Sequence, residues 1–168
     1  MTISFFVPGH PKTAGSKRHV GRGIIVDSSG AKGREWRALV QDRCREALQF
    51  SEKPAIAFGP VRLGVVFVLP RINAHYRGKE HKMRDDAPYH HATRPDTTKL
   101  LRAVEDSLTG IAWRDDAQVA VQEAWKVYGD EPGAFIRIEA LPARGAMAHV
   151  PPEAVLIPSV LDLGGGMA

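Results

Sequence analysis

The 168-residue sequence contains a single cysteine, Cys44. One cysteine excludes a disulfide scaffold and a zinc site built from cysteine ligands. No stretch approaches the roughly 20 consecutive apolar residues that a membrane helix needs. The first residues, MTISFFVPGHPK, lack the basic start and the long apolar run of a secretory signal. Internal repeats are absent as well. These absences favour one ordinary domain, for which we expect a cytoplasmic location.

The composition is that of a globular protein, but the charge is unevenly distributed. Hydrophobic residues make up 43% and charged residues 25% of the chain, which is enough for a packed core. Residues 1–50 have nine Lys and Arg against four Asp and Glu, and residues 51–100 have nine against five. Residues 101–168 have five against ten. A basic front two thirds predicts a polyanionic partner, with nucleic acid first and a merely solvated basic surface as the alternative.

Hydrophobic spacing predicts a single α+β domain over residues 1–142, in which a mixed sheet packs against two main helices. Alternating residues predict strands, and helical spacing predicts the two helices; the strands are expected at 2–7, 24–26, 60–69, 118–128 and 134–141, and the helices at 33–49 and 96–108. The strand at 60–69 is apolar on both faces, which predicts a central place in the sheet. The turn at 129–133 predicts a hairpin between the last two strands. Residues 143–168 are expected to form a flexible tail.

Residues 71–93 form the least periodic segment and hold four of the seven histidines. The spacing of these histidines, at 75, 81, 90 and 91, matches no zinc-ligand pattern. We expect a long basic loop that contacts DNA phosphates. Tyr76 and Tyr89 within it are candidates for stacking on unpaired bases, or for ordinary packing. Trp36, Trp113 and Trp125 are expected in the core.

Three aspartates carry the chemistry that the sequence suggests. Asp96 lies at the start of the second predicted helix, and Asp115 and Asp116 lie between that helix and the next strand. Carboxylates of this kind bind Mg²⁺ together with phosphate oxygens. In an otherwise basic protein, acids placed where a polyanion docks are costly unless a cation bridges the two. Arg102, on the same helix, is placed to stabilise charge on a phosphate, so the pattern predicts metal-assisted hydrolysis of a phosphodiester.

The same stretch resembles the RusA-like Holliday-junction resolvases, which are small DNA endonucleases of bacteria and phages. The family pattern is K/R-P-D-x-D-N-L-x-K, then D-A-L-x-G, then W/F-x-D-D-A/S-Q-V, with V-P-G-x-P near the N-terminus. The chain has RPDTTKLLR from Arg94, DSLTG from Asp106, WRDDAQV from Trp113 and VPGHP from Val7. The resemblance extends from about Ile3 to Leu141.

The resemblance implies a Mg²⁺-dependent endodeoxyribonuclease, with Mn²⁺ as a substitute, that nicks four-way DNA junctions symmetrically in recombination and repair. It implies an intertwined homodimer in a bacterial or phage-infected cell. By position, Asp96 and Asp116 match metal-binding and catalytic aspartates, and Asp115 is the neighbour of Asp116. Arg102 stands where the family commonly has a catalytic lysine. Residues Lys12, Lys17, Arg18, Arg22, Lys79, Lys82, Arg84, Arg94 and Lys99 are expected to contact DNA.

Two positions depart from the family pattern. Thr98 replaces the second aspartate, and Lys99 replaces the asparagine after it. Three outcomes follow: Asp115 and Asp116 both bind the metal, Asp85 or Asp86 supplies the missing carboxylate, or the site is inactive. The last outcome leaves a junction-binding protein, and a nuclease for flaps or forks is a further alternative. Glu105 is expected to be a solvated helix residue and Asp106 to be structural.

Overall fold

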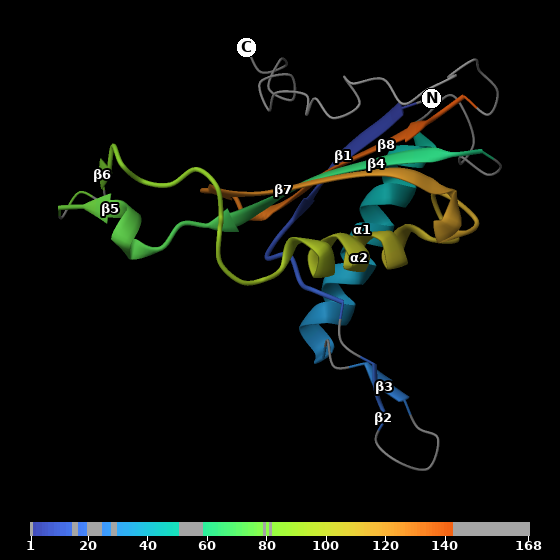
Figure 1. The fold of residues 1–168 in the computed structure, drawn as a ribbon, viewed down its shortest axis with the longest axis horizontal. Coiled ribbons are helices and arrows are strands. Elements are labelled where there is room, and N and C mark those ends of the chain that lie inside the picture. Colours follow the sequence, from blue (N-terminus) through green and yellow to red (C-terminus); the bar gives the residue numbers. More distant parts are fainter. Residues whose placement is uncertain are drawn as a thin grey trace.

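The structure, a computed structural model, describes residues 2–14, 17–19, 25–27, 30–50, 59–78, 80 and 82–142. Of residues 15–29 it describes the backbone of two short strands and no side chains. The elements, shown in Figure 1, are β1 (Thr2–Pro8), β2 (Lys17–His19), β3 (Ile25–Asp27), α1 (Gly30–Gln49), β4 (Val61–Pro70), η1 (Asn73–His75), β5 (Tyr76–Arg77), β6 (Lys82–Met83), α2 (Thr97–Leu108), η2 (Asp116–Gln118), β7 (Val119–Gly129) and β8 (Gly133–Ala140). The tail expected over residues 143–168 lies outside the described residues.

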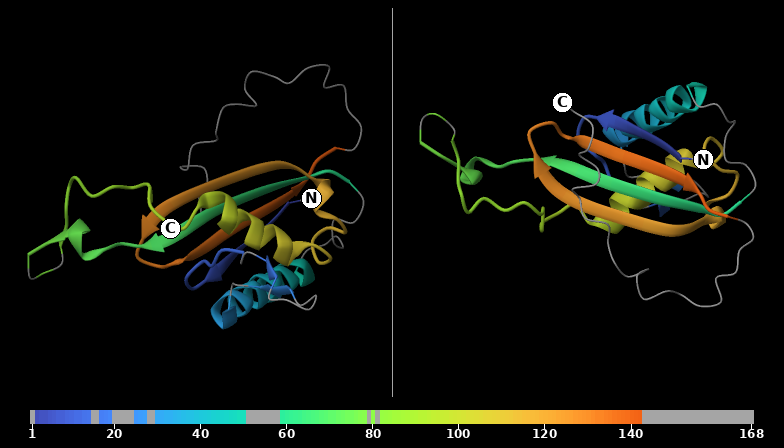
Figure 2. Two further views of the ribbon diagram at one scale, coloured as in Figure 1. Left: turned by 60° about the horizontal axis from the view of Figure 1, so that its bottom comes forward. Right: turned by 90° about the horizontal axis from the view of Figure 1, so that it is seen from above.

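Four strands form one mixed sheet in the order β1-β8-β4-β7. The pairs β1–β8 and β4–β8 are antiparallel, and the pair β4–β7 is parallel. The right-hand view of Figure 2 shows the four strands side by side. The expected α+β class, the mixed sheet and the central position of β4 are therefore confirmed. A strand that is apolar on both faces is typical of the middle of a sheet, and β4 is paired on both of its edges, with β8 and with β7.

The hairpin predicted between the last two strands is wrong. β4 lies between β7 and β8, so the turn at residues 130–132 crosses the end of β4 and the strands that it joins are not neighbours. α2 makes the crossover that a parallel β4–β7 pair requires. The glycines and the proline of the turn indicate a change of direction, but they carry no information about a strand inserted between the two arms.

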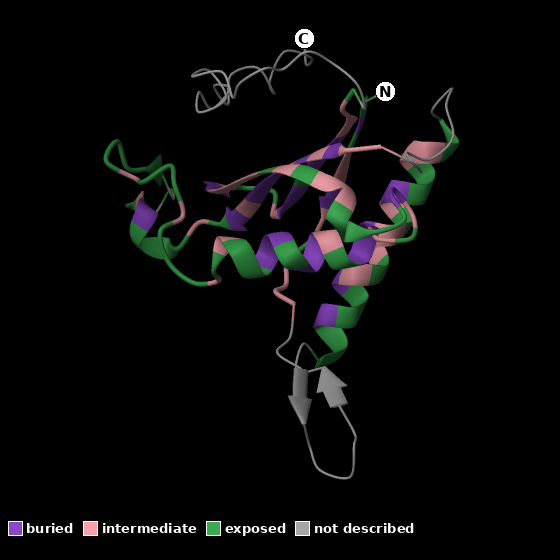
Figure 3. Ribbon diagram, turned by 45° about the vertical axis from the view of Figure 1, so that its right-hand side comes forward, coloured by how far each residue is buried: buried purple, intermediate pink, exposed green. Residues whose placement is uncertain are grey.

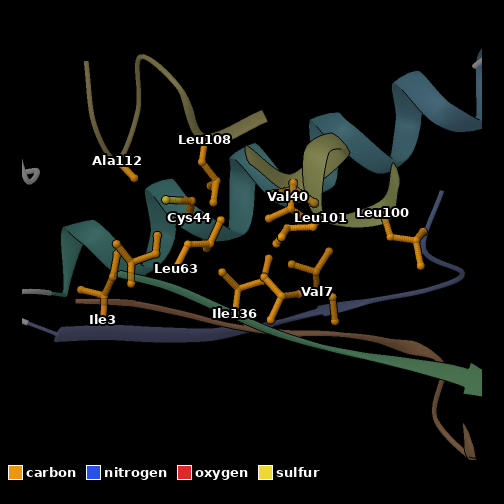
Figure 4. Packing of buried hydrophobic residues seen from close by; sticks show 14 of the residues in the cluster. Ile3, Val7, Val40, Cys44, Leu63, Leu100, Leu101, Leu108, Ala112 and Ile136 are labelled. Atoms are coloured by element: carbon orange, nitrogen blue, oxygen red, sulfur yellow. The ribbon is translucent and has the colours of Figure 1, made fainter. Parts of the chain in front are cut away.

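Both helices cover the same face of the sheet and bury one hydrophobic core (Figures 1 and 3). The inward side chains of the sheet meet Val40 and Cys44 of α1 and the apolar stripe of α2; Figure 4 shows this packing. Trp36 and Trp113 lie in this core, as expected. Trp125 does not, because its position in β7 turns it toward the opposite, outer face of the sheet, where it is half-buried.

Two excursions leave the sheet. β2 and β3 pair as a small hairpin, which confirms the short return strand expected near residue 25. The segment at 71–93, expected to be an irregular loop, contains η1 and the paired strands β5 and β6. It projects beyond the end of the sheet (Figure 1), and we call it the lobe. Backbone bonds from His91 N–H to Lys126 O and from Tyr128 N–H to Tyr89 O fasten its return path to β7.

Candidate active site

α2 is the platform on which the expected site residues lie. Its buried stripe holds Leu100, Leu101, Val104 and Leu108, and Ala103 and Ser107 beside it are buried too. The exposed side of the helix carries Thr98, Lys99, Arg102 and Asp106. The helix ends at Thr109, and Gly110 follows with a φ of 81°, the left-handed conformation that glycine adopts at low cost after a helix. The acidic residues singled out in the sequence lie beyond the two opposite ends of this helix.

At the N-terminal end, Asp96 is surrounded by cations. Its Oδ2 lies 2.7 Å from Lys99 Nζ. The hydrogen bond and the charge of Lys99 lower the pKa of Asp96, and the charges of Arg94 and Lys126 lower it further. Lys126 is fixed there because its Nζ donates to the carbonyl oxygens of Thr93 and Pro95, each at 2.6 Å. The Asp96 carboxylate is thus compensated by protein side chains, and it does not cap α2.

At the other end, the sequence DDAQ folds into a tight capping box. Asp115 Oδ1 accepts a hydrogen bond from the Ala117 N–H at 2.9 Å, and Gln118 Oε1 accepts one from the Asp115 N–H at 3.1 Å. Gln118 Nε2 donates to the carbonyl of Gly59 at 3.0 Å, which ties the turn to the start of β4. These bonds determine the backbone of Asp115 and Asp116, so the two adjacent carboxylates have a defined position.

The carboxylates of Asp115 and Asp116 also lie within hydrogen-bonding reach of each other. The bond from the Ala117 N–H, followed by the bond with Asp116, lowers the pKa of Asp115. Two adjacent carboxylates gain electrostatic stabilisation when a cation binds to both. Oxygen donors of this kind are the ligands that Mg²⁺ prefers, and Mg²⁺ takes one or two protein carboxylates beside water and phosphate. The donor set at this end therefore fits a magnesium-type ion.

Glu105 is a third acid at this end, and its expected role as a solvated residue is wrong. It is half-buried, and its Oε1 accepts a hydrogen bond from Gln122 Nε2 of β7 at 2.7 Å. Burial raises the pKa of Glu105, and the charges of Asp116 and Asp106 add to that effect, while the bond from Gln122 opposes it. Its place four residues after Leu101, at the edge of the apolar stripe, is the sequence feature that indicates partial burial.

The structure does not bring Asp96 to Asp115 and Asp116. Asp116 neighbours Glu105, and Asp96 precedes Glu105 by nine residues along α2, a rise of about 13 Å. Among the described residues, no three His, Cys, Asp or Glu side chains gather closely enough to hold a metal ion. Arg102 lies on the exposed side of α2, with Nε 4.0 Å from the Asp106 carboxylate.

Asp85 and Asp86 do not take the place of the missing carboxylate. Both lie in the lobe, where Asp85 pairs with Arg77 at 3.2 Å and Asp86 pairs with Arg84 at 2.8 Å. The hydrogen bond from Arg84 lowers the pKa of Asp86. Figure 1 shows β5 and β6 of the lobe beyond the end of the sheet, while the last residues of the lobe return to the N-terminal end of α2.

A comparison of the sequence with models of protein families identifies the family of this chain. Residues 8–139, most of the chain, match the family model of the endodeoxyribonuclease RusA. The chain belongs to the RusA family. The match runs from the last residue of β1 into β8 and includes both ends of α2, so the resemblance to the RusA-like Holliday-junction resolvases is confirmed. No curated protein matches the chain. None of the helices that the structure describes is long and apolar enough to cross a membrane.

In this RusA-family chain the expected DNA-contacting residues are spread over three places. Lys82 and Arg84 are exposed on the lobe, and Arg94 and Lys99 are exposed at the N-terminal end of α2. Lys12, Lys17, Arg18 and Arg22 belong to the basic segment at 12–22, which we call the arm. Lys12 at its start is half-buried, and the Ala14 N–H donates to the Lys99 carbonyl of α2 at 3.2 Å. The side chains of Lys17 and Arg18 lie outside the described residues, as do Arg22 and Lys79.

The lobe histidines and tyrosines fulfil mostly packing roles. His75 is buried edge-on against Tyr128, with ring centres 4.5 Å apart, and His91 packs on the same ring at 4.6 Å. The Tyr76 hydroxyl lies 3.5 Å from Asp130. Tyr89 is exposed, and its ring lies edge-on to that of His90 with ring centres 5.0 Å apart. His81 lies outside the described residues.

Proposed function

We propose that this RusA-family endodeoxyribonuclease is a Mg²⁺-dependent enzyme, with Mn²⁺ as a substitute, that nicks four-way DNA junctions. The observation that carries the proposal is the Asp115–Asp116 pair, which the capping box holds within a region matched to the family. A basic protein that holds two adjacent carboxylates at one place suits a phosphodiester bridged by a cation. Its setting is the cytoplasm of a bacterial or phage-infected cell.

Asp115 and Asp116 are the proposed metal ligands. Asp115 uses Oδ1 for the Ala117 N–H, which leaves the rest of this carboxylate available to a cation. A bound divalent cation would lower the pKa of an attacking water and screen charge on the leaving oxygen. Glu105 adds negative charge beside Asp116 and strengthens the attraction for a cation. Arg102, exposed near this end, is proposed to stabilise the charge that develops on the phosphate.

Asp96 is the third carboxylate of the proposal, and it is the most constrained one. Its ion pair with Lys99 has to open before it binds a cation. The charges of Arg94 and Lys126 oppose a second cation there. Lys99 and Arg94 are better suited to a DNA phosphate, and we assign them that role. Asp96 therefore contributes less to metal binding than the Asp115–Asp116 pair.

The proposed DNA-binding surface joins the arm, the lobe and the N-terminal end of α2. Its members are Lys12, Lys17, Arg18, Arg22, Lys79, Lys82, Arg84, Arg94 and Lys99. Contacts of lysine and arginine with phosphates supply most of the affinity of such surfaces and make it depend on salt. Two symmetric nicks in a four-way junction require two sites related by a two-fold axis, so we propose that the working form is a homodimer.

A second function is favoured by one specific observation. Thr98 supplies no charge where the family pattern has an aspartate, and Lys99 forms an ion pair with the remaining carboxylate at that end. At this end of α2 the negative charge of Asp96 is neutralised by Lys99, which weakens its attraction for a metal ion. The chain is therefore also a candidate junction-binding protein with weak or no catalysis. The two functions differ in their need for a divalent cation: cleavage of the junction requires one, and binding of the junction does not.

Cleavage of a labelled synthetic four-way junction separates these proposals. The reaction is run with Mg²⁺, Mn²⁺ or EDTA, and a linear duplex, a flap and a fork serve as competing substrates. Paired symmetric nicks that require the metal and favour the junction are the expected result. Tight binding without cleavage establishes the junction-binding alternative, and preferred cleavage of flaps or forks overturns the proposed specificity.

A further inference from the structure

The face of the sheet opposite the two helices carries an apolar row that crosses all four strands. In the register of the sheet, Phe6 of β1 lies beside Phe135 of β8, Phe135 lies beside Val66 of β4, and Val66 lies beside Trp125 of β7. We call these four residues the outer-face patch. None of them belongs to the core cluster under the helices. The patch is thus a second apolar surface on the same sheet.

The patch is packed within itself and is open mainly at Phe135, since Val66 is buried and Phe6 and Trp125 are half-buried. The rings of Phe6 and Phe135 lie with centres 4.5 Å apart. A side chain at Gly133 would meet the Phe6 ring at 2.3 Å, so glycine at this position lets Phe6 lie across the strand. Phe135 remains 52% exposed. Within the described part of the chain, no helix covers this face (Figure 2, right).

An exposed apolar surface of this kind marks a site where something docks. The chain itself offers a matching segment. Residues 155–163, VLIPSVLDL, contain six branched aliphatic residues and a single charge, Asp162. This composition differs from that of segments that remain disordered, which have few large apolar residues and a high net charge. The segment lies beyond the family match, which ends at residue 139.

The connection between the patch and this segment is short. β8, which carries Phe135, ends at Ala140, about 17 Å along the strand from Phe135. The twelve residues 143–154 separate Pro142 from Val155 and reach up to about 40 Å when extended. A segment tethered by such a linker experiences a local concentration in the millimolar range. Weak intrinsic affinity is then enough for docking, and this advantage favours the chain's own segment over a separate partner.

We propose that residues 155–163 dock on the outer-face patch of the same chain and cover Phe135 and Trp125. The proposal concerns the surface opposite α2 and is independent of the nuclease activity. It gives residues 155–163, which lie beyond the family match, the role of binding the outer face of the sheet.

A spin label near the segment tests this docking in the full-length protein. Cys44 is fully buried, and burial raises the pKa of its thiol to about 11, so it resists labelling. A label on Gly164→Cys, next to the segment, is expected to reduce the amide NMR signals around Phe135 and Trp125. Signals from the exposed face of α1 are expected to keep their intensity.

A pair of matched substitutions makes the test specific. Phe135→Asp is expected to abolish the signal loss, whereas Arg137→Asp, on the same strand and the same face, is expected to preserve it. Unchanged amide signals of the core confirm that each variant is folded. The docking proposal is overturned by undiminished signals at the patch, or by losses that persist in Phe135→Asp. It is also overturned if spin-labelled, isotope-unlabelled chains reduce the signals of isotope-labelled chains, because a second copy is then the occupant.

Discussion

The two ends of α2 place the same kind of side chain in opposite electrostatic surroundings. At the N-terminal end, one carboxylate, that of Asp96, faces Lys99, Arg94 and Lys126. At the C-terminal end, Asp116 and Glu105 lie together with further acids and raise one another's electrostatic energy. The negative charge at the N-terminal end is already balanced by protein cations, whereas the negative charge at the C-terminal end would be stabilised by a bound cation.

This difference shows that a motif aspartate has no fixed chemistry of its own. The neighbours at positions 98 and 99 turn the N-terminal end of α2 into a cationic surface, while the capping box keeps the other end acidic. The predictions below test whether catalysis follows this division, in order from the largest expected effect to the smallest.

Asp116→Asn is expected to lower the cleavage rate by about 10³-fold, the upper range for losing one electrostatic group at a reacting phosphate or acyl centre. The substitution removes a proposed metal ligand and leaves the capping box intact. The rate is measured with a labelled junction at saturating Mg²⁺, and junction binding is measured separately in EDTA. Asp106→Asn, in the same acidic group but exposed at the end of α2, is the control and is expected to stay near the parent rate.

Arg102→Ala is expected to lower the single-turnover rate by about 10²-fold, since one donor to the developing phosphate charge is lost. Arg102→Lys keeps a cation at this position and is expected to recover most of the rate. Binding to the junction should change little in either variant, because a single exposed cation contributes a small part of the affinity. Equal loss of rate in the alanine and lysine variants would contradict a charge-based role.

Asp96→Asn is expected to lower the rate by about tenfold, the lower range for groups that act on a metal site indirectly. The weaker effect follows from the cations around Asp96. The double variant Thr98→Asp with Lys99→Asn removes one cation and adds one carboxylate at this end. It is expected to lower the Mn²⁺ concentration needed for half-maximal cleavage. A rate loss in Asp96→Asn as large as that of Asp116→Asn would remove the distinction between the two ends.

Lys82→Ala is expected to reduce the salt dependence of junction binding by about one unit of slope, as expected for one lost phosphate contact. Lys82 is exposed on the lobe. Lys32→Ala is the control, because Lys32 is an exposed lysine of α1 that lies outside the proposed DNA-binding surface. Affinity is measured at several salt concentrations, and an unchanged slope for Lys82→Ala would exclude the lobe from the DNA-binding surface.

Glu105→Gln is expected to cause a small change in how the free energy of unfolding depends on pH. The pKa of Glu105 is raised by burial, so folding favours its protonated form. The resulting contribution to stability is full below the ordinary pKa of 4.5 and is lost as the pH rises through the raised value. The variant lacks this loss, so its stability relative to the parent should rise between acid and neutral pH. Urea unfolding on both sides of 4.5 measures the difference.

The helices and strands could be predicted because their apolar spacing is local. The burial of Leu100, Leu101, Val104 and Leu108 confirms a stripe that the sequence already displays. The partners of the strands could not be predicted in the same way. The turn after Gly129 has the composition of a hairpin, but β4, which precedes it by some sixty residues, occupies the intervening place. Strand order depends on contacts between distant segments, and local turn chemistry does not contain that information.

The candidate site shows the same limit. The residue types at 96, 115 and 116 were identified from the sequence, but their separation was not, because the whole of α2 lies between them. Glu105 was expected to be solvated, and its hydrogen bond with Gln122 of a later strand could not be predicted from local spacing. The ion pair of Lys99 with Asp96 was not among the predicted outcomes, and it follows from their three-residue spacing at the start of α2.

The position of β8 has a consequence for how the protein is made. β8 is the last of the described strands to leave the ribosome, yet it lies between β1, the first of them, and β4. Until residues 133–140 emerge, β1 has no partner in the sheet, and the sheet face beneath α2 is incomplete. Pairings between such distant segments form late in folding. The surface on which α2 packs is therefore completed only after β8 has been made.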